Sequence, residues 1–153
     1  RILVTMGAGA APPVRGLRPV AAVAPGVAAA TGLSLQQLAA ALVGQLRPAA
    51  VVCVDSLCSA EGQRLGRTVQ FSDSGLYPAQ ADHTRHLTRD TLGVPVVAAG
   101  IPTLMQAQEG ADLVVTPRAL DSVIAHGAAL LAGSVNRALQ PRLTVQQLCW
   151  LTG

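Results

Sequence analysis

Lysine is absent from this 153-residue sequence, and aromatic residues make up only 2% of it. The missing lysine excludes a phosphate-binding loop of the Gly-x4-Gly-Lys-Ser/Thr type. All 11 basic residues are arginines, and they are scattered along the chain without forming a basic run. Because few aromatic rings are present to stack on bases, the composition gives little support to direct nucleic-acid binding.

Other motifs that indicate a reaction class are also missing. The sequence contains neither a Gly-x-Ser-x-Gly elbow nor a His-Glu-x-x-His zinc motif. His83 and His86 lie near Asp82, but a closed metal site needs further ligands, so we expect a solvated loop and no metal or cofactor. The apolar runs are broken by Gly, Pro or charged residues, so we expect neither a signal peptide nor a membrane span.

Charged residues make up only 12% of the chain, whereas 50% of its residues are hydrophobic. This predicts that part of the surface is buried against another subunit or a further piece of the same chain. Three cysteines at no metal-like spacing indicate a reduced, cytoplasmic protein, with Cys53 in the core. The length predicts a single domain over residues 1–153. Because the sequence opens inside an apolar pattern and without Met, we expect that domain to lack its N-terminal portion.

What the sequence does contain is an alternation of apolar runs and helical patterns. Short, continuously apolar runs are typical of strands that are covered on both faces. Ser34 and Thr144 stand where helix N-caps are expected. The predicted strands are residues 18–24, 50–54, 67–71 and 94–99, and the predicted helices are residues 35–43, 56–63, 118–138 and 145–151. This order predicts an α/β fold with a mainly parallel central sheet flanked by helices.

Asp55 directly follows one of the predicted buried strands. Ligands of open α/β sheets bind beyond the carboxyl ends of the strands, so Asp55 is expected to be half-buried at a crevice. Burial and a second carboxylate would raise the pKa of one acid of a pair, which could then activate water and protonate a leaving amine. The alternative interpretation is that Asp55 only caps the helix predicted to follow it.

The polar loop Ser72-Asp73-Ser74-Gly75 follows another predicted strand. Its hydroxyl and backbone amide groups are suited to holding a peptide substrate. The alternative interpretation is a turn closed by Ser or Asp side chains, which this composition explains without any function.

Several short blocks occur in an order that is more specific than any one of them. They are R-P-V-A-A-V-A-P-G-V at residues 18–27, V-D-S-L at 54–57, T-V-Q-F-S-D-S-G-L-Y-P at 68–78, L-G-V-P-V-V-A-A-G-I-P-T at 92–103, V-T-P-R at 115–118 and L-A-G-S-V-N-R-A-L at 131–139. Together they resemble the spore germination protease family, in which corresponding blocks read I-D-A-L, T-I-Q-I-S-D-T-G-I-x-P and L-G-I-P-V-I-A-I-G-V-P-T.

The resemblance implies an aspartic-type endopeptidase that degrades small acid-soluble spore proteins at germination. It implies a fold similar to that of the hydrogenase-maturation proteases (phosphorylase/hydrolase-like), a zymogen, a homotetramer and a place in the spore core. Asp55 matches one of the family's two proposed catalytic aspartates. The other belongs to a T-P-D-A-L-G-P-like block with no counterpart here, so we expect the partner acid to come from sequence before Arg1.

Two segments depart from the family pattern. Residues 79–84 read A-Q-A-D-H-T where the family has G-S-G-V-G-N, and the segment between Thr103 and Asp112 is short where the family has a long polar insertion. The missing aspartate favours a second hypothesis, a catalytically inactive homologue that serves as a binding or oligomerisation module. A third is a small-molecule hydrolase or phosphorylase that uses the same kind of crevice.

Overall fold

The computed structural model describes residues 1–6, 15–26, 31–77, 86–106 and 114–153. The chain divides into two units. Unit 1 comprises Arg1–Ala24 and Ala125–Gly153, and unit 2 comprises Pro25–Ile124. The single domain over residues 1–153 stays a prediction.

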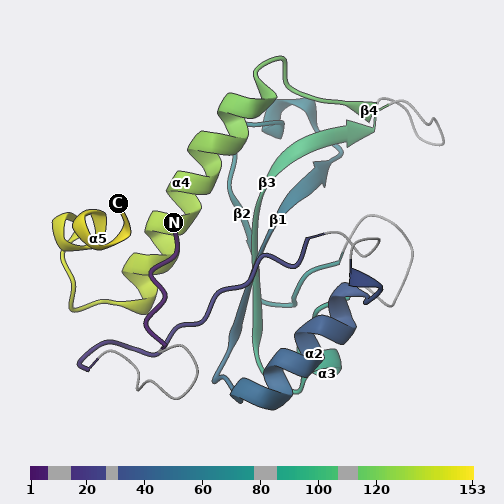
Figure 1. Ribbon diagram of the computed structural model, residues 1–153. Helices are drawn as coiled ribbons and strands as arrows, with labels where there is room; N and C mark the ends of the chain where they lie inside the picture. Colours follow the sequence, from purple (N-terminus) through teal and green to yellow (C-terminus); the bar gives the residue numbers. More distant parts are fainter. Residues whose placement is uncertain (7–14, 27–30, 78–85, 107–113) are drawn as a thin grey trace. The chain divides into compact units, whose positions relative to one another are not determined.

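Unit 2 is built on a four-stranded mixed sheet (Figure 1). β1 (Val51–Ser59) pairs in parallel with β3 (Val96–Gln106), whereas β2 (Gln70–Ser72) and β4 (Val114–Val115) pair with β3 in the antiparallel direction. The α/β class is confirmed, but the sheet is not mainly parallel, because only the β1–β3 pairing is parallel among the described strands. β1 and β2 are joined by a short connection without an α-helix, so β2 runs back in the opposite direction. β2 is therefore antiparallel to β3, which is parallel to β1.

β1 and β3 run further than the apolar pattern predicts. The pattern predicts strands that end before Asp55 and Gly100, yet the two residues are paired inside the sheet. Residues 56–63 therefore form no α-helix, and both the predicted helix and a helix-capping role for Asp55 are wrong. The strands continue through polar residues because ladder hydrogen bonds come from the backbone, which apolar periodicity does not report.

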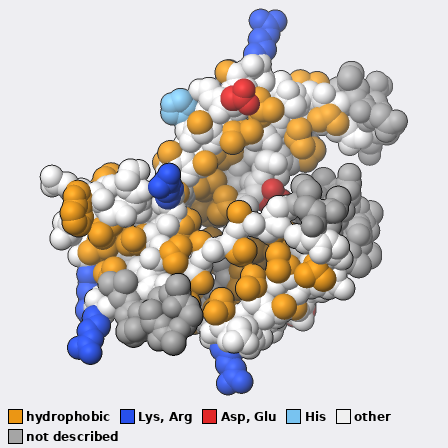
Figure 2. All heavy atoms as spheres, in the orientation of Figure 1, with side chains coloured by type: hydrophobic (Ala, Val, Ile, Leu, Met, Phe, Trp, Pro, Cys, Tyr) orange, Lys and Arg blue, Asp and Glu red, His pale blue; other side chains and the backbone are white. Residues whose placement is uncertain are grey.

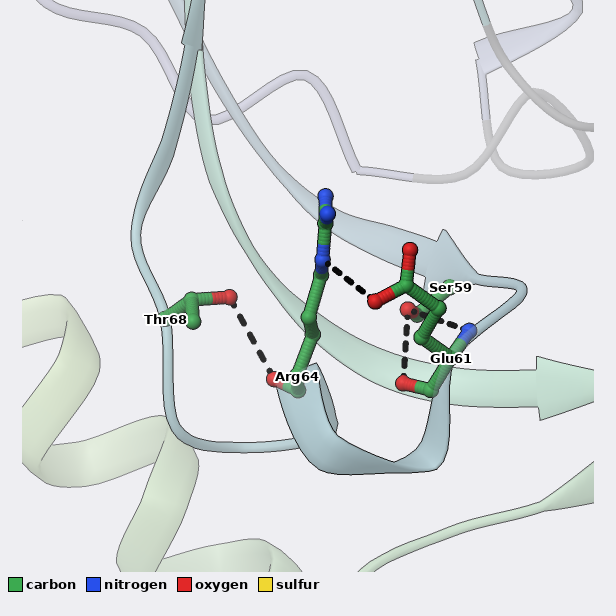
Figure 3. Close-up of polar contacts among 4 residues, drawn as sticks. All are labelled: Ser59, Glu61, Arg64 and Thr68. Carbon is green, nitrogen blue, oxygen red and sulfur yellow. Dashed lines mark hydrogen bonds and ion pairs between the residues drawn. The ribbon is translucent and has the colours of Figure 1, made fainter.

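Side-chain contacts hold the connection that follows β1. Ser59 Oγ donates to the Glu61 carbonyl at 3.0 Å and accepts from the Glu61 N–H at 3.1 Å (Figure 3). Arg64 Nε forms an ion pair with Glu61 Oε2 at 3.0 Å, and the Thr68 hydroxyl donates to the Arg64 carbonyl at 3.3 Å. A single 3-10 turn, η1 (Gly62–Arg64), completes this connection, which returns the chain into β2.

One face of the sheet is covered by α2 (Leu35–Leu46) and α3 (Arg89–Leu92). Ser34 caps α2, because its Oγ accepts the Gln37 N–H while Gln37 Oε1 accepts the Ser34 N–H. Such a cap stabilises a helix by about 1 kcal/mol. The core beneath consists of Cys53, Leu76, Leu87, Leu92, Val96 and Ala98, with Leu35, Ala39 and Val43 of α2 packed against it. The predicted helix over residues 35–43 is confirmed.

The other face of the sheet is exposed at several apolar side chains. Val52, Val54, Phe71 and Val97 are 40%, 52%, 65% and 38% exposed. Side chains alternate between the faces of a strand, so these residues lie opposite the core set that includes Cys53 and Ala98. Hydrophobic side chains also reach the surface over α2 (Figure 2). Unit 2 thus buries one sheet face well and the other incompletely.

Unit 1 contains α5 (Val145–Thr152) and most of α4 (Leu120–Leu139). Both predicted helices are confirmed, although α4 starts two residues later than expected. Residues 18–24 form no strand, and within that stretch only Val20 is buried, so the strand prediction there is wrong. Side chains, not a strand, bind part of this backbone: Gln140, the residue after α4, holds the Arg18 N–H and carbonyl. In the described part of the chain no helix is long and apolar enough to cross a membrane.

Candidate active site

Asp55 lies at the fifth position of β1, with Gly100 of β3 on one side. On its other side no strand of the described residues pairs with β1. Its side chain is exposed, so the expected half-buried position at a strand end is wrong. One carboxylate oxygen, Oδ1, accepts the N–H of the next residue, Ser56, at 2.8 Å. The carboxylate is therefore bound to its own strand and open to solvent.

The Cys53 thiol, two residues before Asp55 on β1, is affected by the charge of Asp55. Burial raises the pKa of the Cys53 thiol, and the negative charge of Asp55 raises that pKa further. A thiol that stays protonated is a poor nucleophile. Cys53 is therefore a core residue, as expected, and not a candidate for nucleophilic attack.

Gly100 allows the two long strands to approach closely beside Asp55. A Cβ atom at this position would meet the backbone carbonyl of Asp55 and would lie 2.6 Å from Leu57 Cγ. Only glycine fits where another backbone comes so near. Gln70 of β2 pairs with Gly100 from the opposite side, so one row across the sheet reads Asp55, Gly100, Gln70.

The loop at residues 72–75 forms the turn that the alternative interpretation predicted. The Ser74 N–H donates to Ser72 Oγ at 3.2 Å, and the two hydroxyl oxygens lie 2.7 Å apart. Gly75 is buried with φ +106°, where a side chain would meet the Leu87 carbonyl. Asp73 and Ser74 are exposed. The turn explains the composition of the loop, and its substrate-binding role stays a prediction.

The structure does not bring this loop next to Asp55. Ser72 pairs with Ala98, which pairs with Cys53, so the Ser72 row precedes the Asp55 row by two residues. Two residues along a strand and two strand spacings correspond to about 7 Å and about 10 Å. Because β2 runs antiparallel, the loop leaves the sheet toward the beginning of β1 and β3. The sequence could not show this, because strand direction is set by the connections and not by periodicity.

The remaining sequence-based candidates add no second cluster. Asp82 and His83 lie outside the described residues, as do the departures at residues 79–84 and most of the segment from 104 to 111. His86 is described, and its ring stacks edge-on against Tyr77 with 5.0 Å between ring centroids. Within the described ranges no three His, Cys, Asp or Glu side chains gather as a metal site would require. Sequence reasoning missed Gly100 and Gln70, because only the strand register places them beside Asp55.

Comparison with known proteins identifies residues 12–112 as a match to the germination protease family. The chain is 28% identical to the germination protease of Clostridium perfringens over 86% of its own length and 55% of that protein. It is 33% identical to the germination protease of Bacillus licheniformis over 82% of its length and 34% of the relative. The corresponding values for Bacillus subtilis are 38%, 60% and 26%.

The chain thus spans about half, or less, of the length of these curated relatives. The matched region includes Asp55, Gly100 and the loop at residues 72–75. The order of the sequence blocks and the match over residues 12–112 both indicate the same family. The chain belongs to the germination protease family of peptidases.

Proposed function

We propose that this chain is part of an aspartic-type endopeptidase in which Asp55 is one of two carboxylates that activate water. The observation that carries the proposal is the family match over residues 12–112, which contains Asp55 in its V-D-S-L block. In such a pair, an ionised carboxylate takes a proton from water as the water attacks the peptide carbonyl. The protonated partner then supplies a proton to the leaving amine.

The proposal assigns the partner carboxylate to the part of the relatives' length that this chain does not span. The solvent-exposed side chain of Asp55 leaves space for another acid beside it. The hydroxyl and amide groups of the loop at residues 72–75 are proposed to hold a part of the substrate away from the scissile bond. No metal or cofactor enters this scheme, because the two acids supply all the proton transfers it needs.

The proposed substrates are the small acid-soluble spore proteins, and the proposed place of action is the spore core. The proposal also includes synthesis as a zymogen and assembly as a homotetramer. Exposed apolar side chains support an oligomer, since Phe71 is 65% and Trp150 is 83% exposed. Analytical ultracentrifugation over a range of protein concentrations measures the assembly directly, and a monomer at every concentration would contradict it.

The proposal is tested by replacing Asp55 in the full-length protein that contains this chain. We expect Asp55→Asn to abolish cleavage of an acid-soluble spore protein, because the amide can neither accept nor deliver the proton. Circular dichroism should be unchanged, since an exposed side chain contributes little to packing. Asp90→Asn, which alters an exposed carboxylate on α3, is the matched control and should cleave normally. Mass spectrometry of the products measures both, and cleavage retained by Asp55→Asn would refute the assignment.

One observation favours a second candidate function, a catalytically inactive homologue. The Asp55 carboxylate is exposed and bound to the backbone of its own strand, which is also how a purely structural aspartate behaves. In that case the full-length wild-type protein would bind spore proteins or assemble without cutting any of them. Binding without products, measured in the same assay, separates this candidate from the endopeptidase.

A further inference from the structure

Among the described strands, β1 forms one border of the sheet in unit 2 (Figure 1). Among the described residues its nine positions pair with β3 alone. A strand at a border presents a row of unpaired backbone groups, and an extended chain of another molecule can pair with that row. Asp55, the candidate carboxylate, lies within this border strand.

The register shows which backbone groups of β1 face outward. The Val51 N–H donates to the Pro95 carbonyl at 2.9 Å, so residue 51 is directed at β3. In a parallel ladder, alternate residues are directed at opposite neighbours. Val52, Val54 and Ser56 therefore present their N–H and C=O groups to the free border.

The Asp55 carboxylate is placed at the same border. Its Oδ1 accepts the N–H of Ser56, and that N–H is one of the outward-facing donors. A charged side chain at a sheet border discourages unspecific pairing between molecules. The same position brings the carboxylate next to the line along which an added strand would run.

Side chains along this border suit a protein segment without regular structure. Val52 and Val54 are 40% and 52% exposed, and they offer apolar contact to alternate side chains of a paired segment. Only a segment whose own backbone is unpaired can supply the hydrogen bonds. A peptidase acts on such segments, and an added strand lies about 4.8 Å from its neighbour.

We propose that an extended segment of the protein substrate pairs as an added strand with the free border of β1, at Val52, Val54 and Ser56. A substrate carbonyl then accepts the hydrogen bond of the Ser56 N–H in place of Asp55 Oδ1. This releases Oδ1 to face the neighbouring peptide bond of the substrate. This inference rests on the proposed function, because it assumes that Asp55 acts on a peptide. It adds the conformation in which the substrate binds and the backbone groups that hold it.

Val54→Pro tests the pairing with little change to the fold. Proline removes the Val54 N–H, which is directed away from β3, and a proline is tolerated at a strand border. Val54→Ala is the matched control, because it shortens the side chain and keeps the N–H. The probe is a soluble ten-residue peptide of threonine, valine and lysine, titrated into each variant in the Asp55→Asn background. We expect Val54→Pro to weaken binding at least tenfold and Val54→Ala to weaken it less than threefold.

Amide hydrogen exchange followed by NMR provides a second measurement that does not depend on the proline. With the peptide bound, exchange should slow at Val52, Val54 and Ser56 and stay unchanged at Cys53, whose N–H is directed at β3. Equal binding by both variants, uniform slowing along β1, or no binding of the peptide would overturn the inference. A change of oligomeric state in Val54→Pro without a change in peptide affinity would do the same, because it would assign the border to a second copy.

The cleavage assay keeps this inference separate from the proposed function. Asp55-dependent cleavage that Val54→Pro leaves intact refutes strand addition and leaves the peptidase assignment standing. Alternating protection of β1 by the peptide, with no cleavage by the full-length wild-type protein, refutes the peptidase assignment and keeps the binding mode.

Discussion

Different kinds of contact stabilise the interior of each of the two units. Unit 2 buries apolar side chains of a sheet beneath α2 and α3, and its core set contains no charged residue. Unit 1 relies on buried polar side chains, in α4 and directly after it, that bind backbone outside helices and strands. Asn136 accepts the Leu3 N–H and donates to the Arg1 carbonyl, both at 2.8 Å, and Gln140 binds Arg18 in the same two-pronged way.

This difference shows two ways of satisfying the same backbone requirement. In unit 2 the strands supply hydrogen bonds to one another, so side chains are free to be apolar. In unit 1 the amides of Asn136 and Gln140, both almost completely buried, stand where a neighbouring strand would be. Thr5 contributes in the same manner, because its buried hydroxyl donates to the Arg18 carbonyl and accepts the Val20 N–H. Loss of a side chain should therefore have different consequences in the two units.

The largest effect is expected where unit 2 is best packed. Leu76 is 5% exposed, so Leu76→Ala should lower the free energy of unfolding by about 2–5 kcal/mol, through lost burial and the cavity left behind. Val97→Ala removes an apolar side chain from the open face of the same sheet and should change stability by about 0.5 kcal/mol or less. Urea titrations of both variants measure the contrast. Equal losses would mean that the open face is covered after all.

A smaller loss is expected for the amide contacts of unit 1. Asn136→Leu keeps a side chain of similar size but leaves the Leu3 N–H and the Arg1 carbonyl without their partner, which should cost about 1–3 kcal/mol. Ser134→Leu introduces the same side chain at an exposed position of the same helix and should be nearly neutral. Thermal unfolding of the two variants measures the difference. A neutral Asn136→Leu would show that these backbone groups are satisfied by water.

The smallest effect concerns the buried thiol beneath Asp55. The raised pKa of Cys53 favours the protonated thiol in the folded state, so its contribution to stability is present below the ordinary thiol pKa of 9.0 and is lost as the pH rises above it. The slope should be at most about 1.4 kcal/mol per pH unit. Cys53→Ala should remove this part of the alkaline decline, as measured by urea titration at several pH values.

The rate at which iodoacetamide modifies Cys53 is an independent test of its burial and its raised pKa. Cys58 and Cys149 are exposed, so iodoacetamide should modify both before it modifies Cys53, as followed by mass spectrometry of the intact chain. Modification of all three at one rate in the folded protein would contradict both the burial of Cys53 and its raised pKa.

Local signals in the sequence predicted the local features well. Ser34 and Thr144 cap helices as expected, because a capping side chain contacts backbone only three residues away. The apolar runs around Cys53 and Ala98 predicted two strands, and the structure pairs them in parallel. The expected cover on both faces is wrong for β1, because Val52 and Val54 are exposed. The blocks around Asp55 and Ser72 predicted the family, since a shared order of motifs survives changes in the residues between them.

Features that depend on register could not be predicted in this way. Asp55 was expected at a strand end, but β1 continues to Ser59 because the backbone of β3 continues beside it. The sequence did not place the loop that begins at Ser72 relative to Asp55, and the antiparallel direction of β2 separates the two. Asn136 gave no sign of its role, because the backbone that it binds is more than a hundred residues away in the chain.

By itself, the sequence determined the family and the helix caps, because both depend on side-chain types at short spacing. Only the tertiary structure decided that Asp55 lies exposed at a strand border and that Gly100 and Gln70 share its row. It also decided that the side-chain amides of Asn136 and Gln140 replace a strand in unit 1. These outcomes depend on which distant backbone groups pair with one another, and any side chain can accompany such a pairing.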